Sequence, residues 1–164
     1  MDCTLRDGGN VVGKGFDATL TKMMIEGLIA SNITLIEMGN CLGIGAYEAA
    51  NSIAPCTDEE YLKLVQPYLN KAEIGMFMGW KNGTDKNVGL AKEYGLHFLR
   101  VGANAGDGKS AMDAVKKVKA AGLTCRYSLM KAYVLSAEEL AEEAAMLEDC
   151  GLDEITIMDS AGTM

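Results

Sequence analysis

Short apolar runs alternate with longer amphipathic stretches along the whole chain, and this alternation limits the possible folds more than any other feature. The apolar runs resemble β-strands and occupy residues 3–6, 33–38, 73–78, 98–103, 124–130 and 154–158. The amphipathic stretches have the length of helices and occupy residues 17–30, 57–69, 84–94, 109–121 and 136–150. Strands separated by single helices pair in parallel through right-handed crossovers, so the pattern predicts an α/β protein with a parallel sheet.

Local capping patterns mark both ends of the predicted helices. Asp17 can cap the first helix, and capping boxes pair Thr57 with Glu60 and Ser136 with Glu139. Three helices end directly before a strand at a glycine, the residue best suited to a left-handed stop: Gly95, Gly122 and Gly151.

Two architectures have this order of elements, the doubly wound open sheet and the (β/α)8 barrel. The 164 residues contain six predicted strands and five predicted helices, whereas a barrel needs eight strands and typically about 250 residues. We therefore expect an incomplete parallel (β/α)8 TIM barrel, in which residues 1–164 form the N-terminal three-quarters of a single catalytic domain. A complete six-stranded open sheet is the alternative.

Composition narrows the class of protein further. The chain is 49% hydrophobic and 23% charged, with a net charge of −8, which predicts one globular domain and argues against nucleic-acid and membrane-surface partners. It has neither an apolar run of the roughly 18 residues that a spanning helix needs nor a signal-peptide pattern at its start. Its five cysteines form no Cys-x-x-Cys pair, so we expect reduced thiols and a cytoplasmic protein.

Polar residues follow several of the predicted strands, at the end where both architectures build their sites. Arg6, Asp7 and Asn10 follow the first strand, Glu37 ends the second and Ser160 follows the last. Asp supplies a hard oxygen ligand for a divalent cation, and Arg supplies a fork of donors that stays charged. Further polar or aromatic residues at the same rim are Trp80, Lys81, Asn104, Lys131, Tyr133 and Asp159. This set predicts an enzyme site for an anionic, oxygen-rich small molecule.

Several short motifs, spread over nearly the whole chain, also have counterparts in one group of enzymes. They are Thr4-Leu-Arg-Asp-Gly8, Ile36-Glu37, Thr57-Asp-Glu-Glu-Tyr61, Leu129-Met130 and Met158-Asp-Ser-Ala-Gly162. With them the chain resembles the metal-dependent aldolase and Claisen-condensation TIM barrels, and within that superfamily the 4-hydroxy-2-oxovalerate aldolases.

The resemblance implies a role for each candidate residue. Asp7 would bind a divalent metal, Mn²⁺ or Mg²⁺, and Arg6 would stabilise the oxygen of a pyruvate enolate. Glu37 would act in catalysis by orienting these two residues, and Ser160 would bind the keto acid. Asn10 stands where the aldolases carry a catalytic histidine. Because an amide cannot serve as a base near neutral pH, Asn10 is assigned to substrate binding.

The reaction implied is the metal-dependent cleavage of a 4-hydroxy-2-keto acid to pyruvate and an aldehyde. The alternatives are a Claisen-type acyl transferase that joins acetyl-CoA to a 2-keto acid, and a non-catalytic barrel fragment. The family's His-x-His metal ligands would lie beyond Met164, so we expect this chain alone to bind metal weakly. The resemblance also suggests an acylating aldehyde dehydrogenase as partner, and open sheet edges suggest a homo-oligomer or self-association.

Three other features have competing interpretations. Lys131 ends a strand, where it could form a Schiff base or pair with a substrate carboxylate. His97 starts a strand and is expected at the opposite, structural end of the sheet. The glycine-rich loop at residues 102–110 could cradle a phosphate, but its spacing departs from the known motif and favours an ordinary helix start.

Overall fold

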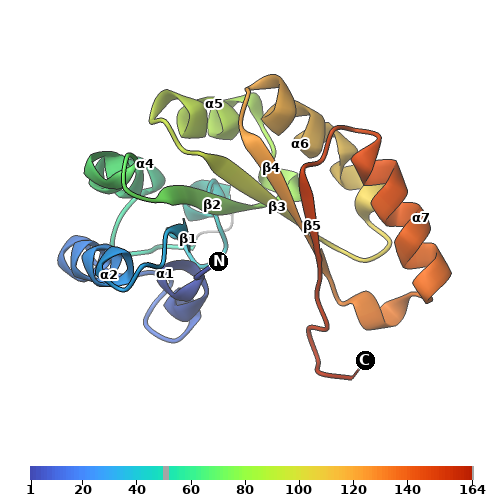
Figure 1. Ribbon diagram of the computed structural model, residues 1–164, viewed down its shortest axis with the longest axis horizontal. Helices are drawn as coiled ribbons and strands as arrows, with labels where there is room; N and C mark the ends of the chain where they lie inside the picture. The colour runs from blue at the N-terminus through green and yellow to red at the C-terminus, as the bar shows by residue number, and fades with distance from the viewer. Residues whose placement is uncertain (50–51, 164) are drawn as a thin grey trace.

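The computed structural model describes residues 1–49 and 52–163, and their strands form one parallel sheet in the order β1-β2-β3-β4-β5. The strands are β1 (Leu35–Glu37), β2 (Glu73–Gly79), β3 (Phe98–Asn104), β4 (Thr124–Met130) and β5 (Glu154–Ile157). The sheet curls into a half-barrel rather than lying flat (Figure 1). The prediction of an α/β, incomplete TIM-barrel-like fold is therefore confirmed.

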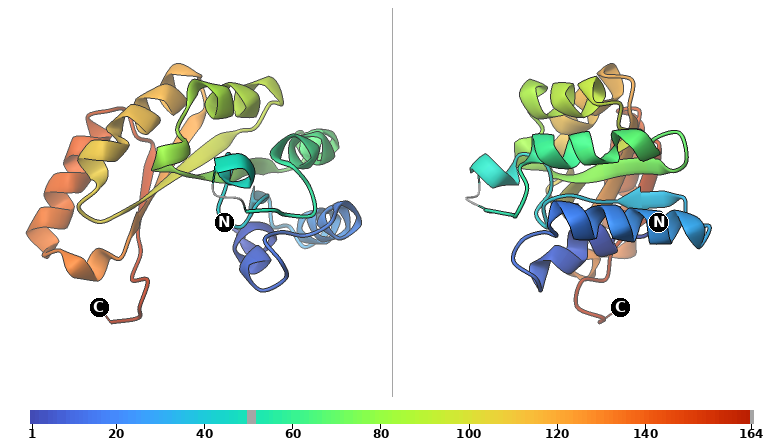
Figure 2. Two further views of the ribbon diagram at one scale, coloured as in Figure 1. Left: turned by 180° about the vertical axis from the view of Figure 1, so that it is seen from behind. Right: turned by 90° about the vertical axis from the view of Figure 1, so that its left-hand side faces the viewer.

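Helices cover the convex, outer face of the sheet, as Figure 1 and the left panel of Figure 2 show from opposite sides. The longer helices are α2 (Ala18–Ala30), α4 (Asp58–Val65), α5 (Asp85–Glu93), α6 (Gly108–Ala120) and α7 (Ala137–Glu148). The shorter elements are α1 (Thr4–Asp7), α3 (Ala46–Ala49), and the 3-10 turns η1 (Gly8–Asn10), η2 (Gln66–Tyr68), η3 (Trp80–Asn82) and η4 (Ala132–Val134). Within the described ranges, no helix is both long and apolar enough to cross a membrane.

The predicted capping patterns set the helix bounds. Asp17 accepts a hydrogen bond from the backbone N–H of Leu20 at 2.9 Å, and both capping boxes form at Thr57 and Ser136. Three glycines adopt left-handed conformations at the ends of α5, α6 and α7: Gly95 at φ 79°, Gly122 at φ 80° and Gly151 at φ 91°. Each of the five longer helices lies within two residues of its predicted limits, except that the helix beginning at Asp58 continues after Val65 as a 3-10 turn.

The predicted first strand at residues 3–6 is wrong. Asp2 alone forms a parallel bridge to Ile36, and the chain then turns into α1. The Asp2 carboxylate accepts the backbone N–H of Thr4 at 3.0 Å, and the N–H of Asp7 closes a helical turn on the carbonyl of Cys3 at 2.7 Å. A four-residue apolar run is too short for periodicity to separate strand from helix. Five strands are therefore present in the described residues, not six.

The two faces of the sheet differ sharply in chemistry, because alternate residues of a strand point to opposite sides. The outer face is apolar and packs against the helices in the main core, with Ile36, Ile74, Met76, Leu99, Val101, Cys125, Tyr127 and Leu129. The inner, concave face is polar and aromatic, with Glu37, Phe77, Phe98, Arg100, Arg126 and Ser128. A barrel lined by buried charged groups offers a preformed frame for a polar site.

Candidate active site

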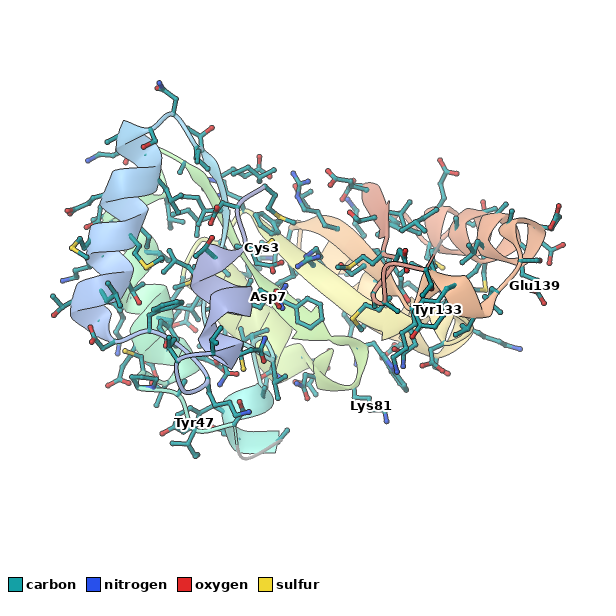
Figure 3. All side chains as sticks on the ribbon, turned by 90° about the horizontal axis from the view of Figure 1, so that it is seen from below. Cys3, Asp7, Tyr47, Lys81, Tyr133 and Glu139 are labelled. Carbon is teal, nitrogen blue, oxygen red and sulfur yellow. The ribbon has the colours of Figure 1, made fainter. Side chains whose placement is uncertain are left out.

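Arg6 reaches the concave face from α1, which Asp2 ties to the carboxyl end of β1. Its Nε donates to Glu37 Oε1 at 2.7 Å, and its Nη1 donates to Asp7 Oδ1 at 2.8 Å and to the carbonyl of Cys41 at 3.4 Å. The guanidinium also lies over the Phe77 ring, 5.0 Å from its centroid. Figure 3 shows the same turn, with Asp7 projecting over the strands. Among the described residues, Arg6 Nη2 takes part in none of these bonds.

Glu37 connects Arg6 to a second arginine, Arg100, in the middle of β3. Arg100 Nε and Nη2 each donate to one Glu37 oxygen at 2.5 Å, and Arg100 Nη1 donates to Ser128 Oγ at 2.5 Å. The Glu37 side chain is fully buried and Arg100 is 3% exposed. Burial opposes the charge of Arg100, but its hydrogen bond and attraction to Glu37 outweigh this and raise the pKa of the guanidinium. The result is a buried Arg–Glu–Arg triad with one net positive charge.

The ring of Phe77 packs against both arginines. Its centroid lies 5.0 Å from the Arg6 guanidinium and 5.4 Å from that of Arg100. Gly102 on the neighbouring strand makes room for it, since a Cβ there would lie 2.1 Å from Phe77 Cζ. Cation–π contact with both arginines adds to the salt bridges in holding the triad in place.

Asp7, the proposed metal ligand, is the most accessible member of the group. Its side chain is 66% exposed, and one oxygen, Oδ1, accepts from Arg6 at 2.8 Å and from the Asn10 amide at 3.4 Å. Across residues 1–49 and 52–163, no group of three or more His, Cys, Asp or Glu side chains is placed to hold a metal ion. The described residues therefore fit one ligand of a metal, not a complete metal site.

Ser160 lies in another part of the same rim. It follows β5, at the sheet edge opposite β1, and its Oγ accepts the backbone N–H of Lys131 at 2.9 Å. In Figure 1 the segment after β5 extends away from α1. The structure thus brings together Arg6, Asp7, Asn10 and Glu37, and it places Ser160 with Lys131 instead.

The structure also places Lys131, His97 and the glycine-rich loop at residues 102–110. Lys131 directly follows β4 in a left-handed conformation with φ 54° and is exposed. His97 precedes β3 at the amino end of the sheet, and its Nδ1 accepts the backbone N–H of Ile74 at 3.1 Å. In the glycine-rich loop, the buried carboxylate of Glu143 accepts the backbone N–H groups of Gly106 at 2.8 Å and Gly108 at 2.6 Å. This internal carboxylate occupies the place that a phosphate would need.

Cysteine chemistry is disfavoured at the site. Cys3 lies 3.9 Å from Arg100 Nη2, yet burial and the negative charge of Glu37 raise the pKa of its thiol. Burial likewise raises the pKa of Cys125 to about 12. Reactive cysteines need the opposite shift. All five cysteines are free thiols, as predicted.

Sequence reasoning missed Arg100, Ser128 and Phe77. A usable indication was present for Arg100, because a charged residue stands inside an otherwise apolar strand. Charged residues are rarely buried unless they are paired, so such a position points to a buried partner. Nothing in the sequence identifies Ser128 or Phe77 as the neighbours, since that depends on strand register.

Comparison with known proteins agrees with this architecture. The chain is 30% identical over 164 residues to 4-hydroxy-2-oxovalerate aldolase of Carboxydothermus hydrogenoformans, covering 100% of this chain and 49% of the relative. It is 32% identical over 163 residues to the enzyme of the same name from Streptomyces griseus, covering 98% of this chain and 47% of the relative. The chain thus spans about half the length of these curated relatives. No protein-family model matches it.

Solved structures share the fold at lower identity. The N-terminal domain of a putative aldolase from Bacteroides vulgatus matches 99% of this chain with a TM-score of 0.70 and 19% identity, over 55% of that chain. The carboxyl transferase domain of Rhizobium etli pyruvate carboxylase, solved with pyruvate and biocytin, matches 99% of this chain with a TM-score of 0.77 and 15% identity, over 30% of that chain. In sequence, the chain is similar over its full length to enzymes named 4-hydroxy-2-oxovalerate aldolase, and in fold it is similar to the N-terminal domain of a putative aldolase.

Proposed function

We propose that the protein containing this chain is a carbon–carbon lyase that cleaves a 4-hydroxy-2-keto acid to pyruvate and an aldehyde. One observation carries the proposal. The Arg6 guanidinium is held by Glu37, Asp7 and the Phe77 ring at the carboxyl rim, with Nη2 outside these bonds. The names of the relatives point to the same class of reaction.

In the proposed reaction, the bond between C3 and C4 of the keto acid breaks. The electron pair of that bond moves toward the 2-keto oxygen and gives the enolate of pyruvate. The 4-hydroxyl passes its proton to water as the aldehyde forms, and the enolate then takes a proton at C3 to give pyruvate. Arg6 would stabilise the growing negative charge on the enolate oxygen with directed hydrogen bonds. The amide of Asn10 cannot take the hydroxyl proton, so Asn10 and Ser160 are assigned to binding the keto acid. Glu37 acts through Arg6.

The same proposal includes a divalent metal, Mn²⁺ or Mg²⁺, which polarises a carbonyl oxygen when bound. We assign Asp7 as one ligand. Because the described residues contain no group of three or more candidate ligand side chains, the remaining ligands would come from outside them. We further propose that residues 1–164 are the N-terminal three-quarters of one catalytic barrel, that the enzyme is cytoplasmic and homo-oligomeric, and that an acylating aldehyde dehydrogenase takes up the aldehyde.

The test is pyruvate release from a 4-hydroxy-2-keto acid by the protein that contains this chain, with and without EDTA. We expect chelator-sensitive turnover that Asp7→Ala abolishes. Asp113→Asn, which alters an exposed carboxylate on α6, should leave turnover unchanged and is the matched control. Full activity in EDTA would reject the metal and direct attention to Lys131. CoA release from acetyl-CoA and a 2-keto acid, without pyruvate release, would favour the Claisen-type alternative.

A further inference from the structure

Arg100 is unusual among the arginines of the concave face because every nitrogen of its guanidinium has a partner. Nε and Nη2 bond the two oxygens of Glu37, Nη1 bonds Ser128, and only 3% of the residue is exposed. A guanidinium with all its nitrogens engaged has little capacity left for a substrate. Its effect on a reaction must pass through the residue that it holds.

That residue is Glu37, and the pair has the geometry of a clamp. Two parallel N–H···O bonds to one carboxylate fix both its position and its plane, which a single point charge cannot do. The third bond of Glu37 runs from Oε1 to Arg6 Nε at 2.7 Å. The orientation of the Glu37 carboxylate therefore sets where Arg6 Nε lies, and the rigid fork of Arg6 carries Nη2 with it.

Without this clamp Arg6 has a competing partner. Its Nη1 already bonds the exposed carboxylate of Asp7 at 2.8 Å, so a displaced Glu37 would let the guanidinium move toward Asp7. The Phe77 ring cannot prevent this alone, because a cation–π contact fixes distance from the ring more than direction. Such a movement would draw the guanidinium away from the place proposed for the enolate oxygen and would weaken the metal ligand.

We propose that Arg100 is a positioning residue, which orients Nη2 of Arg6 by clamping Glu37 and does not touch the substrate. The effect of this role on catalysis rests on the proposed function. The chain offers a matched control in Arg126, which lies on the next strand of the same face. Arg126 is 9% exposed, pairs with Glu73 and Glu154 and lies over the Phe98 ring, 5.1 Å from its centroid, but bonds neither Glu37 nor Arg6.

The kinetic test uses single and double variants of the protein that contains this chain. Arg100→Lys should lower kcat about ten- to a hundredfold, as loss of a residue supporting a catalytic group typically does, while KM changes by less than about threefold. If Arg100 acts only through Arg6, adding Arg100→Lys to Arg6→Lys should lower kcat no further. The double variant should therefore have the same kcat as Arg6→Lys alone. Arg126→Lys should leave kcat and KM unchanged. The proposal would be overturned if the kcat losses of the two single variants multiply in the double variant, or if Arg126→Lys lowers kcat as much as Arg100→Lys does.

A second readout needs no activity and separates this proposal from the proposed function. In the protein that contains this chain, labelled with ¹⁵N-arginine, hydrogen exchange of the Arg6 Nε–H should be slow. It should accelerate in Arg100→Lys and not in Arg126→Lys. With this result but no lyase activity in the wild type, the function fails and the positioning role stands. With lyase activity but unchanged exchange, the positioning role fails alone.

Ser128→Ala is the second variant, in case Arg100→Lys does not fold. It removes one bond of Arg100 and leaves its pair with Glu37. We expect a smaller loss in kcat, about two- to tenfold, again without a change in KM. A rise in KM at constant kcat would show that Ser128 and Arg100 act in substrate binding and would contradict the proposal.

Discussion

Arg6 combines a fixed charge with a fixed direction, since its fork is held by a buried carboxylate, an exposed carboxylate and an aromatic ring. Arg6→Lys keeps the charge but loses the fork. We expect kcat for pyruvate release to fall about 10²–10³-fold, because one directed donor to a developing oxyanion is worth this much. Mn²⁺ binding should be retained. Stopped-flow or coupled assays at saturating substrate measure the first effect, and Arg126→Lys is the control. A loss below threefold in kcat would remove Arg6 from the enolate site.

Asp7 gives a second prediction at this scale, for the chain by itself. One exposed carboxylate is too few ligands for tight binding, so Mn²⁺ should bind more weakly than about 1 mM, as measured by the electron paramagnetic resonance of the free ion. Asp7→Asn should weaken this binding further, and Asp113→Asn should not. Micromolar binding that survives Asp7→Asn would show a different metal site.

At the scale of single residues, two members of the triad, Arg6 and Glu37, were predicted from the sequence and the third was not. Arg6 and Asp7 are neighbours in the chain. Glu37 contacts Arg6 in the structure, and its role in orienting the pair stays a prediction. Arg100 could not be assigned to them, because it is 63 residues from Glu37 in the chain and meets it only through the parallel register of three strands. Ser160 was predicted at the same rim as Arg6 because it follows the last strand, and its contact in the structure is with Lys131.

At the scale of elements, strong local patterns were sufficient and weak ones were not. The five longer helices and β1 to β5 follow from periodicity, capping boxes and terminal glycines. The run at residues 3–6 failed because the Asp2 side chain and the helical hydrogen bonds of a single turn outweigh the strand propensity of so short a segment. The loop at residues 102–110 was correctly predicted as a helix start. Its partner, Glu143, comes from α7 and could not be seen locally.

The contact of Glu143 with the start of α6 gives a prediction for this element. A Cβ at Gly108 would lie 2.3 Å from Glu143 Oε1, so Gly108→Ala must displace the carboxylate and break its two bonds to backbone N–H groups. We expect the free energy of unfolding to fall by about 1–3 kcal/mol. Gly89→Ala in α5 is the control, because a Cβ there meets nothing within 4 Å. It should raise stability by about 0.5–1 kcal/mol. Urea titrations measure the free energy of unfolding of both variants. A Gly108→Ala variant as stable as the unaltered chain would contradict the role given to the Glu143 contact.

At the scale of the whole molecule, the described sheet ends in edges that a closed barrel would not have. β5 is bonded on one side only, to β4, and Ile157 at its end is 52% exposed. On the other side β1 is flanked only by the single bridge of Asp2. Unpaired parallel edges with exposed apolar side chains invite pairing with another chain.

We therefore expect this chain, expressed alone, to self-associate in a concentration-dependent way, because its open edges can pair between copies. Sedimentation velocity over a range of concentrations measures this directly. Ile157→Lys places a charge at the β5 edge and should shift the population toward monomer. Met23→Lys removes an apolar side chain of similar exposure, 61%, on α2, away from β5, and should leave association unchanged. A cooperative monomer at every concentration would contradict the open-edge interpretation. It would mean that five strands suffice as a stable unit, and it would revive the alternative of an open sheet that is complete without further strands.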